Sequence, residues 1–165
     1  LYTEELVPIN LDDMASDQIS MFDDKENITF QYYGLKDAWV MGPKPQLIRV
    51  FVNLLTNAVQ AIENQQDEDS EAGREPVHGQ IILSVRNSTR ESFYDIVFED
   101  NGPGIKDENR SRLFTPNFTT KSSGTGLGLA ICKNILERCG GEIFYSQSFS
   151  LKGACFTVRF PKMQK

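Results

Sequence analysis

Three glycines on alternate positions, Gly124, Gly126 and Gly128, stand where a stretch with the apolar spacing of a helix begins. The N-terminus of a helix presents unpaired N–H groups and a partial positive charge, which suit a phosphate group. Glycine lets the backbone approach a phosphate closely and adopt conformations that other residues rarely take. The segment predicts a phosphate-binding loop; a flexible turn before a helix explains these residues equally well when they are taken alone.

A carboxylate at the end of a predicted strand is the second candidate for chemistry. Residues 94–100 read as a strand whose two-residue period places Asp100 on the apolar face, pointing inward. A buried carboxylate is costly unless it accepts hydrogen bonds. A local turn into Gly102 would supply them, and so would a ligand such as the amino group of adenine; these residues alone favour the turn. Gly102 and Gly104 would leave room for a flat ring beside the backbone.

Two asparagines four residues apart, Asn53 and Asn57, share one face of a predicted helix, turned away from the centre of its apolar stripe. A solvated polar face is the simplest interpretation. Asparagine is nevertheless a mildly unfavourable choice in a helix interior, where Lys, Glu or Gln would serve better. Side-chain amide oxygens are suitable ligands for Mg²⁺, so the pair is a candidate metal site.

The segment 113–121 is rich in Thr and Asn but contains two aromatic residues, Phe114 and Phe118. These aromatics could anchor a mobile lid, and Lys121 could reach a phosphate as a point charge. A loop simply pinned to the core by two phenylalanines is the alternative, and it is compatible with a lid.

The helices and strands that position these residues are predicted from the spacing of hydrophobic residues and from the Gly and Pro residues that interrupt regular structure. Helices are predicted over 46–63 and 127–139, with short ones over 11–22 and 107–113, and strands over 28–33, 38–41, 81–86, 94–100, 142–147 and 154–160. The first two strands are expected to pair around Gly34, and the polar segment 64–80 is expected to be a solvated loop. This mixture predicts an α+β fold with helices on one face of a sheet.

Composition narrows the classes of function. The chain has 165 residues, 39% of them hydrophobic, and a net charge of −6, which argues against a sequence-independent nucleic-acid binder. No apolar run approaches the roughly 20 residues needed to cross a bilayer. The three cysteines lie in predicted elements and read as reduced thiols of a cytosolic protein. Because the chain begins at Leu1 rather than at Met, we expect it to be a piece of something longer.

Taken in order, four stretches resemble the N, G1, F and G2 boxes of the catalytic and ATP-binding domain of sensor histidine kinases. They are NLLTNA (53–58), DNGPGI (100–105), LFTPNFTTK (113–121) and GTGLGLAICKNI (124–135). The wider superfamily includes DNA gyrase B, MutL and heat-shock chaperones, and the short lid looks most like nitrogen-regulation-type kinases. The resemblance runs from about Asp24 to Pro161, which is nearly the whole domain.

The resemblance implies a two-layer α/β sandwich of the Bergerat type, with a mixed, mainly antiparallel sheet packed on helices and with ATP and Mg²⁺ as cofactors. Asp100 would bind the adenine amino group, and Asn57 would ligate Mg²⁺ with Asn53 nearby. Asn53, Asn57 and Lys121 would act in catalysis. The other expected ATP-binding residues are Gly102, Gly104, Ile105, Phe114, Thr119, Thr120, Gly124, Thr125, Gly126, Leu127, Gly128 and, through a water on the last strand, Thr157.

The position of Asn53 separates subfamilies by chemistry. The ATPase members carry a glutamate there, which activates water, whereas asparagine cannot act as a general base. A kinase that keeps its γ-phosphate for an acceptor histidine is therefore favoured over an ATPase-driven machine. Two further hypotheses about function stay open. One is a degenerate, non-catalytic domain used for docking, and the other is a serine kinase of the same fold.

The acceptor box of the family, a histidine followed by an acid and a proline, is missing, because His78 is the only histidine and stands in PVHGQ. We therefore expect residues 1–23 to be a connector from an absent dimerisation and phospho-acceptor domain, and residues 24–165 to be the catalytic domain. The implied partners are that acceptor domain and the receiver domain of a response regulator. The parent would be a homodimer whose catalytic domain is cytoplasmic and touches no membrane itself, although the parent can be anchored in the inner membrane.

Overall fold

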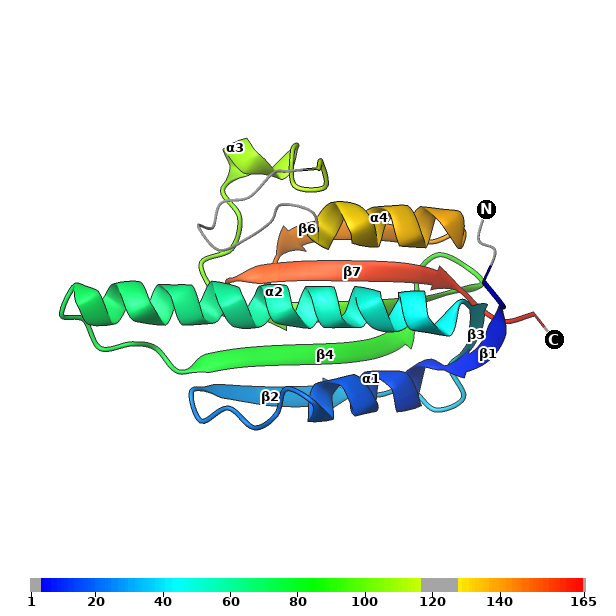
Figure 1. Cartoon of the computed structure of the whole chain (residues 1–165), viewed down its shortest axis with the longest axis horizontal. Coiled ribbons are helices and arrows are strands. Elements are labelled where there is room, and N and C mark those ends of the chain that lie inside the picture. The colour runs from blue at the N-terminus through cyan, green and yellow to red at the C-terminus, as the bar shows by residue number, and fades with distance from the viewer. Residues whose placement is uncertain (1–3, 117–127, 165) are drawn as a thin grey trace.

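Helices cover one face of a five-stranded sheet in the computed structural model, which describes residues 4–116 and 128–164 (Figure 1). The long helix α2 crosses the sheet, with α1 on one side of it and α4 on the other. The elements are β1 (Val7–Asn10), α1 (Leu11–Ser20), β2 (Ile28–Tyr33), β3 (Trp39–Gly42), α2 (Lys44–Glu71), β4 (Gly79–Asn87), β5 (Phe93–Asp100), α3 (Asp107–Arg110), α4 (Gly128–Arg138), β6 (Glu142–Gln147) and β7 (Ala154–Pro161).

The sheet is mixed and mainly antiparallel, as the resemblance implies. Its order is β2-β4-β5-β7-β6; β2 and β4 are parallel, and the other three neighbouring pairs are antiparallel. The expected α+β sandwich is confirmed. The expected pairing of the strands predicted over 28–33 and 38–41 is wrong, because β2 pairs with β4 and β3 pairs with β1 in a separate two-stranded sheet. Alternating apolar residues predict that a segment is a strand, but they do not specify its partner.

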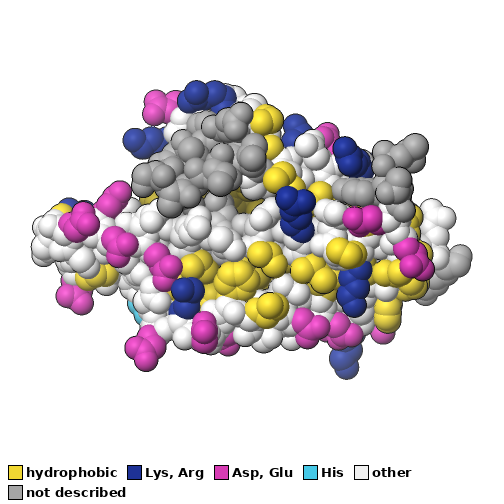
Figure 2. All heavy atoms as spheres, in the orientation of Figure 1, with side chains coloured by type: hydrophobic (Ala, Val, Ile, Leu, Met, Phe, Trp, Pro, Cys, Tyr) yellow, Lys and Arg dark blue, Asp and Glu magenta, His cyan; other side chains and the backbone are white. Residues whose placement is uncertain are grey.

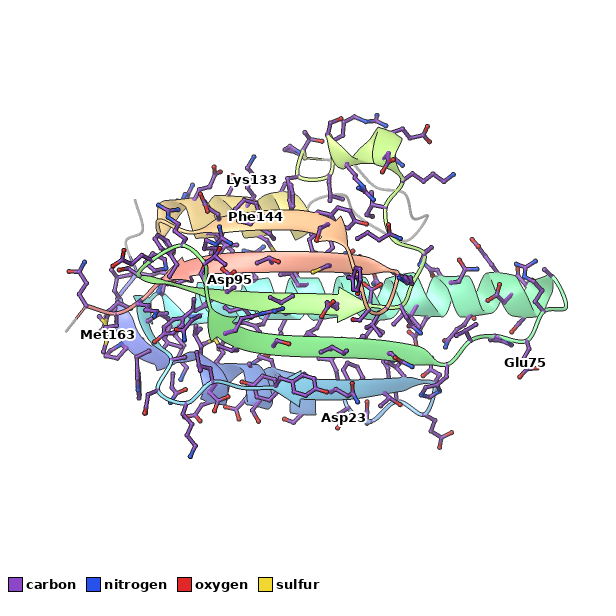
Figure 3. All side chains as sticks on the ribbon, turned by 180° about the vertical axis from the view of Figure 1, so that it is seen from behind. Asp23, Glu75, Asp95, Lys133, Phe144 and Met163 are labelled. Atoms are coloured by element: carbon purple, nitrogen blue, oxygen red, sulfur yellow. The ribbon has the colours of Figure 1, made fainter. Side chains whose placement is uncertain are left out.

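The two faces of the sheet differ in what covers them. On β7, Ala154, Phe156, Val158 and Phe160 are buried in the core beneath the helices. The other face carries no helix among the described elements, and Figure 3 shows Asp95 and Phe144 on it. There Arg159 donates hydrogen bonds to both oxygens of Asp95, at 2.9 and 3.2 Å. A functional site that includes residues of these helices therefore lies on the helix-covered face of the sheet.

Residues 7–20 belong to the packed fold. The side chain of Asn10 caps α1 by accepting a hydrogen bond from the N–H of Asp13 at 3.2 Å. Leu11 and Ala15 on the inner face of that helix are fully buried in the core. The short helix predicted over 11–22 is thus present, but a domain boundary at residue 24 does not separate it from the rest of the core.

The prediction of a loop over 64–80 is wrong for its first part, because α2 continues to Glu71. Polar contacts replace the apolar stripe there. Gln66 donates to the carbonyl oxygens of Asn27 and Val77 at 3.2 and 3.0 Å, and Arg74 pairs with the buried Asp69 at 3.0 Å. Acidic side chains crowd this end of the molecule, where the C-terminal half of α2 lies (Figure 2).

Helix α4 ends as predicted. Gly140 takes the left-handed conformation (φ +77°), and the N–H of Gly141 donates a hydrogen bond to the carbonyl of Leu136 at 2.8 Å, which ends the helix.

Along the described part of the chain, none of the helices combines the length and apolar character that a membrane span requires.

The thiol of Cys132 lies in the packed interface between α4 and α2, where burial raises its pKa from the ordinary 9.0 to about 11. We expect iodoacetamide to alkylate Cys132 at least about 100-fold more slowly in the native chain than in urea. In the native chain the reagent can hardly reach the buried thiol, and little of the thiol is in the reactive thiolate form. Peptide mass spectrometry would measure this, with the half-buried Cys139 and Cys155 as internal controls.

The free energy of unfolding should also fall as the pH rises from 9 towards 11, since the Cys132 thiol ionises first in the unfolded chain. Rapid native labelling of Cys132 would contradict its placement.

Candidate functional site

Asp100 ends β5 and its side chain is buried, with 3% of its surface exposed. Its Oδ1 accepts hydrogen bonds from the N–H of Gly102 at 2.9 Å and from the N–H of Ala154 at 3.3 Å. The local turn expected for this carboxylate is therefore present, together with a second donor from β7. Both donors stabilise the ionised form of the carboxylate and fix its orientation.

Glycines allow three backbone segments to meet at this carboxylate. A Cβ on Gly102 would lie 3.4 Å from the Cβ of Ala61, so Gly102 brings the turn against α2. A Cβ on Gly153 would lie 2.3 Å from the carbonyl oxygen of Asp100 and 2.7 Å from that of Gly102, which no side chain can tolerate. Gly104 takes the left-handed conformation, with φ +73°. Gly153 was not predicted from the sequence, although its place just before a buried strand was a usable signal.

The connection between β6 and β7 is held in place by Ser148, which is 1% exposed. Its hydroxyl donates to Glu99 Oε1 at 2.9 Å and accepts from the N–H of Leu151 at 3.0 Å. Its backbone N–H donates to the carbonyl of Gly153 at 2.7 Å. Ser148 thus positions Gly153 next to Asp100, and nothing in its sequence context identified it.

Asn101 anchors the same turn on its other side. Its Oδ1 accepts from the N–H of Gln80 at 2.8 Å, and its Nδ2 donates to the carbonyl of His78 at 3.0 Å. The side chain therefore ties the turn to the start of β4, which is a structural role.

Asn53 and Asn57 lie on one face of α2 and are both partly exposed. Asn53 Nδ2 approaches the carbonyl oxygen of Gly128, the first residue of α4, at 3.5 Å. Gly102 meets the same helix at Ala61, one turn beyond Asn57. Helix α2 therefore brings both asparagines to the region between the Asp100 turn and the N-terminus of α4.

Phe114 and Ile105 are joined to the sheet by an aromatic cluster. The ring of Phe114 meets Phe156 edge-on at 6.3 Å, and Tyr145 meets Phe156 at 5.3 Å. The hydroxyl of Tyr145 accepts a hydrogen bond from the N–H of Ile105 at 2.9 Å. Phe114 therefore anchors the segment that leads away from α3, as the lid interpretation requires.

The expectation for Thr157 is wrong. Its Cα partner across the ladder is Val97, so both side chains lie on the face opposite Asp100. The residue of β7 that reaches Asp100 is Ala154, through its backbone N–H. Counting the two-residue period back from the buried Phe156 would have shown this.

The remaining predicted residues lie outside the described part of the chain. They are Phe118, Thr119, Thr120, Lys121, Gly124, Thr125, Gly126 and Leu127. Of the predicted glycine-rich segment, Gly128 is described, and a Cβ on it would meet none of the described atoms within 4 Å. Among the described residues no cluster of three His, Cys, Asp or Glu could hold a metal.

The polar groups gathered at this site fit an adenine nucleotide. A buried, oriented carboxylate stands beside backbone that only glycine permits, and an amide pair on a helix lies next to the start of another helix. Carboxylate and backbone groups of this kind recognise a base edge, and amide oxygens suit the Mg²⁺ that accompanies phosphates.

Comparisons with known proteins agree with this interpretation. Residues 42–164 match the family model described as histidine kinase-, DNA gyrase B-, and HSP90-like ATPase. The sensor histidine kinase ZraS of Salmonella typhimurium is 39% identical over 116 residues, which are 70% of this chain and 22% of that protein. The chain spans about a fifth of the length of such curated relatives.

Solved structures show the same relationship. The catalytic domain of the histidine kinase ThkA superposes with a TM-score of 0.79 at 28% identity, covering 96% of each chain. ThkA in complex with the response regulator protein TrrA gives a TM-score of 0.72 at 26% identity, covering 96% of this chain and 42% of that one. The chain therefore belongs to the histidine kinase-, DNA gyrase B- and HSP90-like ATPase family, as the catalytic ATP-binding domain of a sensor histidine kinase.

Proposed function

We propose that this domain binds ATP with Mg²⁺ and transfers the γ-phosphate to a histidine on a separate phospho-acceptor domain. The observation that carries the proposal is the buried Asp100 carboxylate, oriented by the N–H groups of Gly102 and Ala154. In this proposal the carboxylate accepts a hydrogen bond from the adenine amino group, and Gly102 and Gly104 flank the base.

Asn57 would hold Mg²⁺ through its amide oxygen, and Asn53 would stand beside it. The ion would neutralise phosphate charge, which is the main requirement of phosphoryl transfer once the groups are positioned. Because asparagine cannot take a proton from water, Asn53 favours retention of ATP over its hydrolysis. The phosphates would meet the glycine-rich segment and Lys121.

Asn57→Asp should lower the Mg²⁺ concentration that half-maximal ATP binding requires by about tenfold. The reason is that a carboxylate binds the ion more strongly than an amide does. Calorimetric titrations of ATP at several Mg²⁺ concentrations would measure the shift. Asn64→Asp is the matched control, since it adds the same charge to an exposed position two turns along α2. Identical metal titrations for Asn57→Asp and the native chain would count against the ligand assignment.

In this proposal the acceptor histidine lies outside this chain. His78, the only histidine of the sequence, is exposed and its Nε2 lies 2.7 Å from the hydroxyl of Thr29. We propose that the acceptor is a dimerisation and phospho-acceptor domain of the parent, which we propose to be a homodimer with this domain on the cytoplasmic side. The receiver domain of a response regulator is the proposed recipient of the phosphoryl group, and the complex of ThkA with TrrA supports this.

The test is a transfer assay with radiolabelled ATP. The chain alone should stay unlabelled, and a histidine acceptor domain added in trans should become labelled in an acid-labile bond. Label on serine would favour a serine kinase, and no nucleotide binding at all would favour a docking domain. Rapid phosphate release that Asn53→Ala abolishes would favour an ATPase.

A further inference from the structure

Tyr145, on β6, lies outside every motif described above but touches the turn that follows Asp100. Its hydroxyl accepts the hydrogen bond from the N–H of Ile105 at 2.9 Å. The same oxygen would lie 3.4 Å from a Cβ on Gly104, so it rests directly against the turn where the backbone is left-handed. A single side chain from the sheet edge thus reaches the end of the DNGPGI segment.

The ring of Tyr145 is itself fixed from two sides. Phe156 meets it edge-on, with ring centroids 5.3 Å apart, and the guanidinium of Arg110 lies 5.1 Å from its centre. Arg110 Nε in turn donates to the carbonyl of Ile105 at 3.3 Å. Both backbone polar groups of Ile105 are therefore held by two side chains that contact each other.

We propose that Tyr145 is a positioning residue for the nucleotide: its hydroxyl fixes the Gly102–Gly104 turn against the sheet, so that the base-binding wall is already formed before ligand arrives. This inference rests on the proposed nucleotide binding and names a determinant of its affinity. Pre-formed sites bind more tightly because the ordering cost is not incurred on binding.

The hydroxyl, not the ring, carries this role. Phenylalanine would keep the contacts with Phe156 and Arg110 but would leave the Ile105 N–H without its acceptor. The turn would then sample other conformations, of which only a fraction binds the base, and the apparent affinity would fall by that fraction.

The test compares Tyr145→Phe with Tyr94→Phe by calorimetry with ATP and with ADP. Tyr94 is a matched control, because it is buried and its hydroxyl donates to the carbonyl of Asp37 at 3.3 Å, at the other end of β5. We expect Tyr145→Phe to weaken ATP and ADP binding by the same factor, about tenfold, because the turn contacts the base and not the phosphates. Tyr94→Phe should leave both affinities within about twofold.

Hydrogen exchange separates positioning from general loss of structure. In Tyr145→Phe the Ile105 amide should exchange at least about tenfold faster, while the amides of β5 keep their native rates. Unchanged affinity in Tyr145→Phe, or a loss confined to ATP, would overturn the role of Tyr145 while leaving the proposed function intact. Failure of the native chain to bind either nucleotide would overturn the proposed function, and the role of Tyr145 with it.

Discussion

Asp100→Asn should reduce the affinity of the chain for ATP on the order of 100-fold, with the fold retained. An asparagine can still accept the hydrogen bond from the N–H of Gly102, so the turn can persist. The change removes a charged acceptor and adds an NH₂ donor that opposes the adenine amino group. Hydrogen bonds to charged groups contribute about 1.5–3 kcal/mol, which corresponds to roughly 10- to 150-fold in affinity.

Calorimetry with ATP, with and without Mg²⁺, would measure this effect, and thermal unfolding would verify that the variant is folded. Asp95→Asn is the matched control, because Asp95 lies on the same strand but on the opposite face, paired with Arg159. That variant should lose some stability and keep its ATP affinity. Equal affinity of Asp100→Asn and the native chain would exclude Asp100 as the adenine ligand.

Gly153→Ala should impair both folding and nucleotide binding. The added methyl group would lie 2.3 Å from the carbonyl oxygen of Asp100, 2.7 Å from its Oδ1 and 2.7 Å from the carbonyl oxygen of Gly102. Two of these three atoms are backbone, so relief requires the β6–β7 connection to move away from the turn. Overpacking of this kind costs about 1–3 kcal/mol, and we expect a value near the upper end.

Urea unfolding and ATP titration of Gly153→Ala would test this together. Gly42→Ala is a suitable control, since Gly42 is also a buried glycine at a strand end, but its Cβ would meet Phe160 at 3.4 Å, near ordinary contact. Native stability and affinity in Gly153→Ala would mean that the close approach of the three backbone segments is not needed.

Much of this site could be predicted because it depends on local pattern. The inward direction of Asp100 follows from the two-residue period of β5, and the common face of Asn53 and Asn57 follows from helical spacing. The same period places Thr157 on the face of β7 opposite Asp100, so the role implied for it by the family resemblance does not agree with its position.

The features that sequence patterns missed depend on contacts between distant segments. The parallel pairing of β2 with β4 joins residues about 50 positions apart, as in Ile28 with Gly79. The extension of α2 depends on polar bonds from Gln66 to Asn27 and Val77 rather than on an apolar stripe. Ser148 and Tyr145 act through partners 49 and 40 positions away. No local spacing encodes such partners.

The strand order has a consequence for synthesis on the ribosome. The strand β7 is the last of the described strands in the chain, yet it lies inside the sheet between β5 and β6. A nascent chain that has emerged through Gly104 already contains both asparagines and Asp100, but it lacks the Ala154 N–H and the wall that Gly153 provides. If Asp100 binds the nucleotide as proposed, we expect folding and nucleotide retention to be completed together, when β7 inserts between β5 and β6.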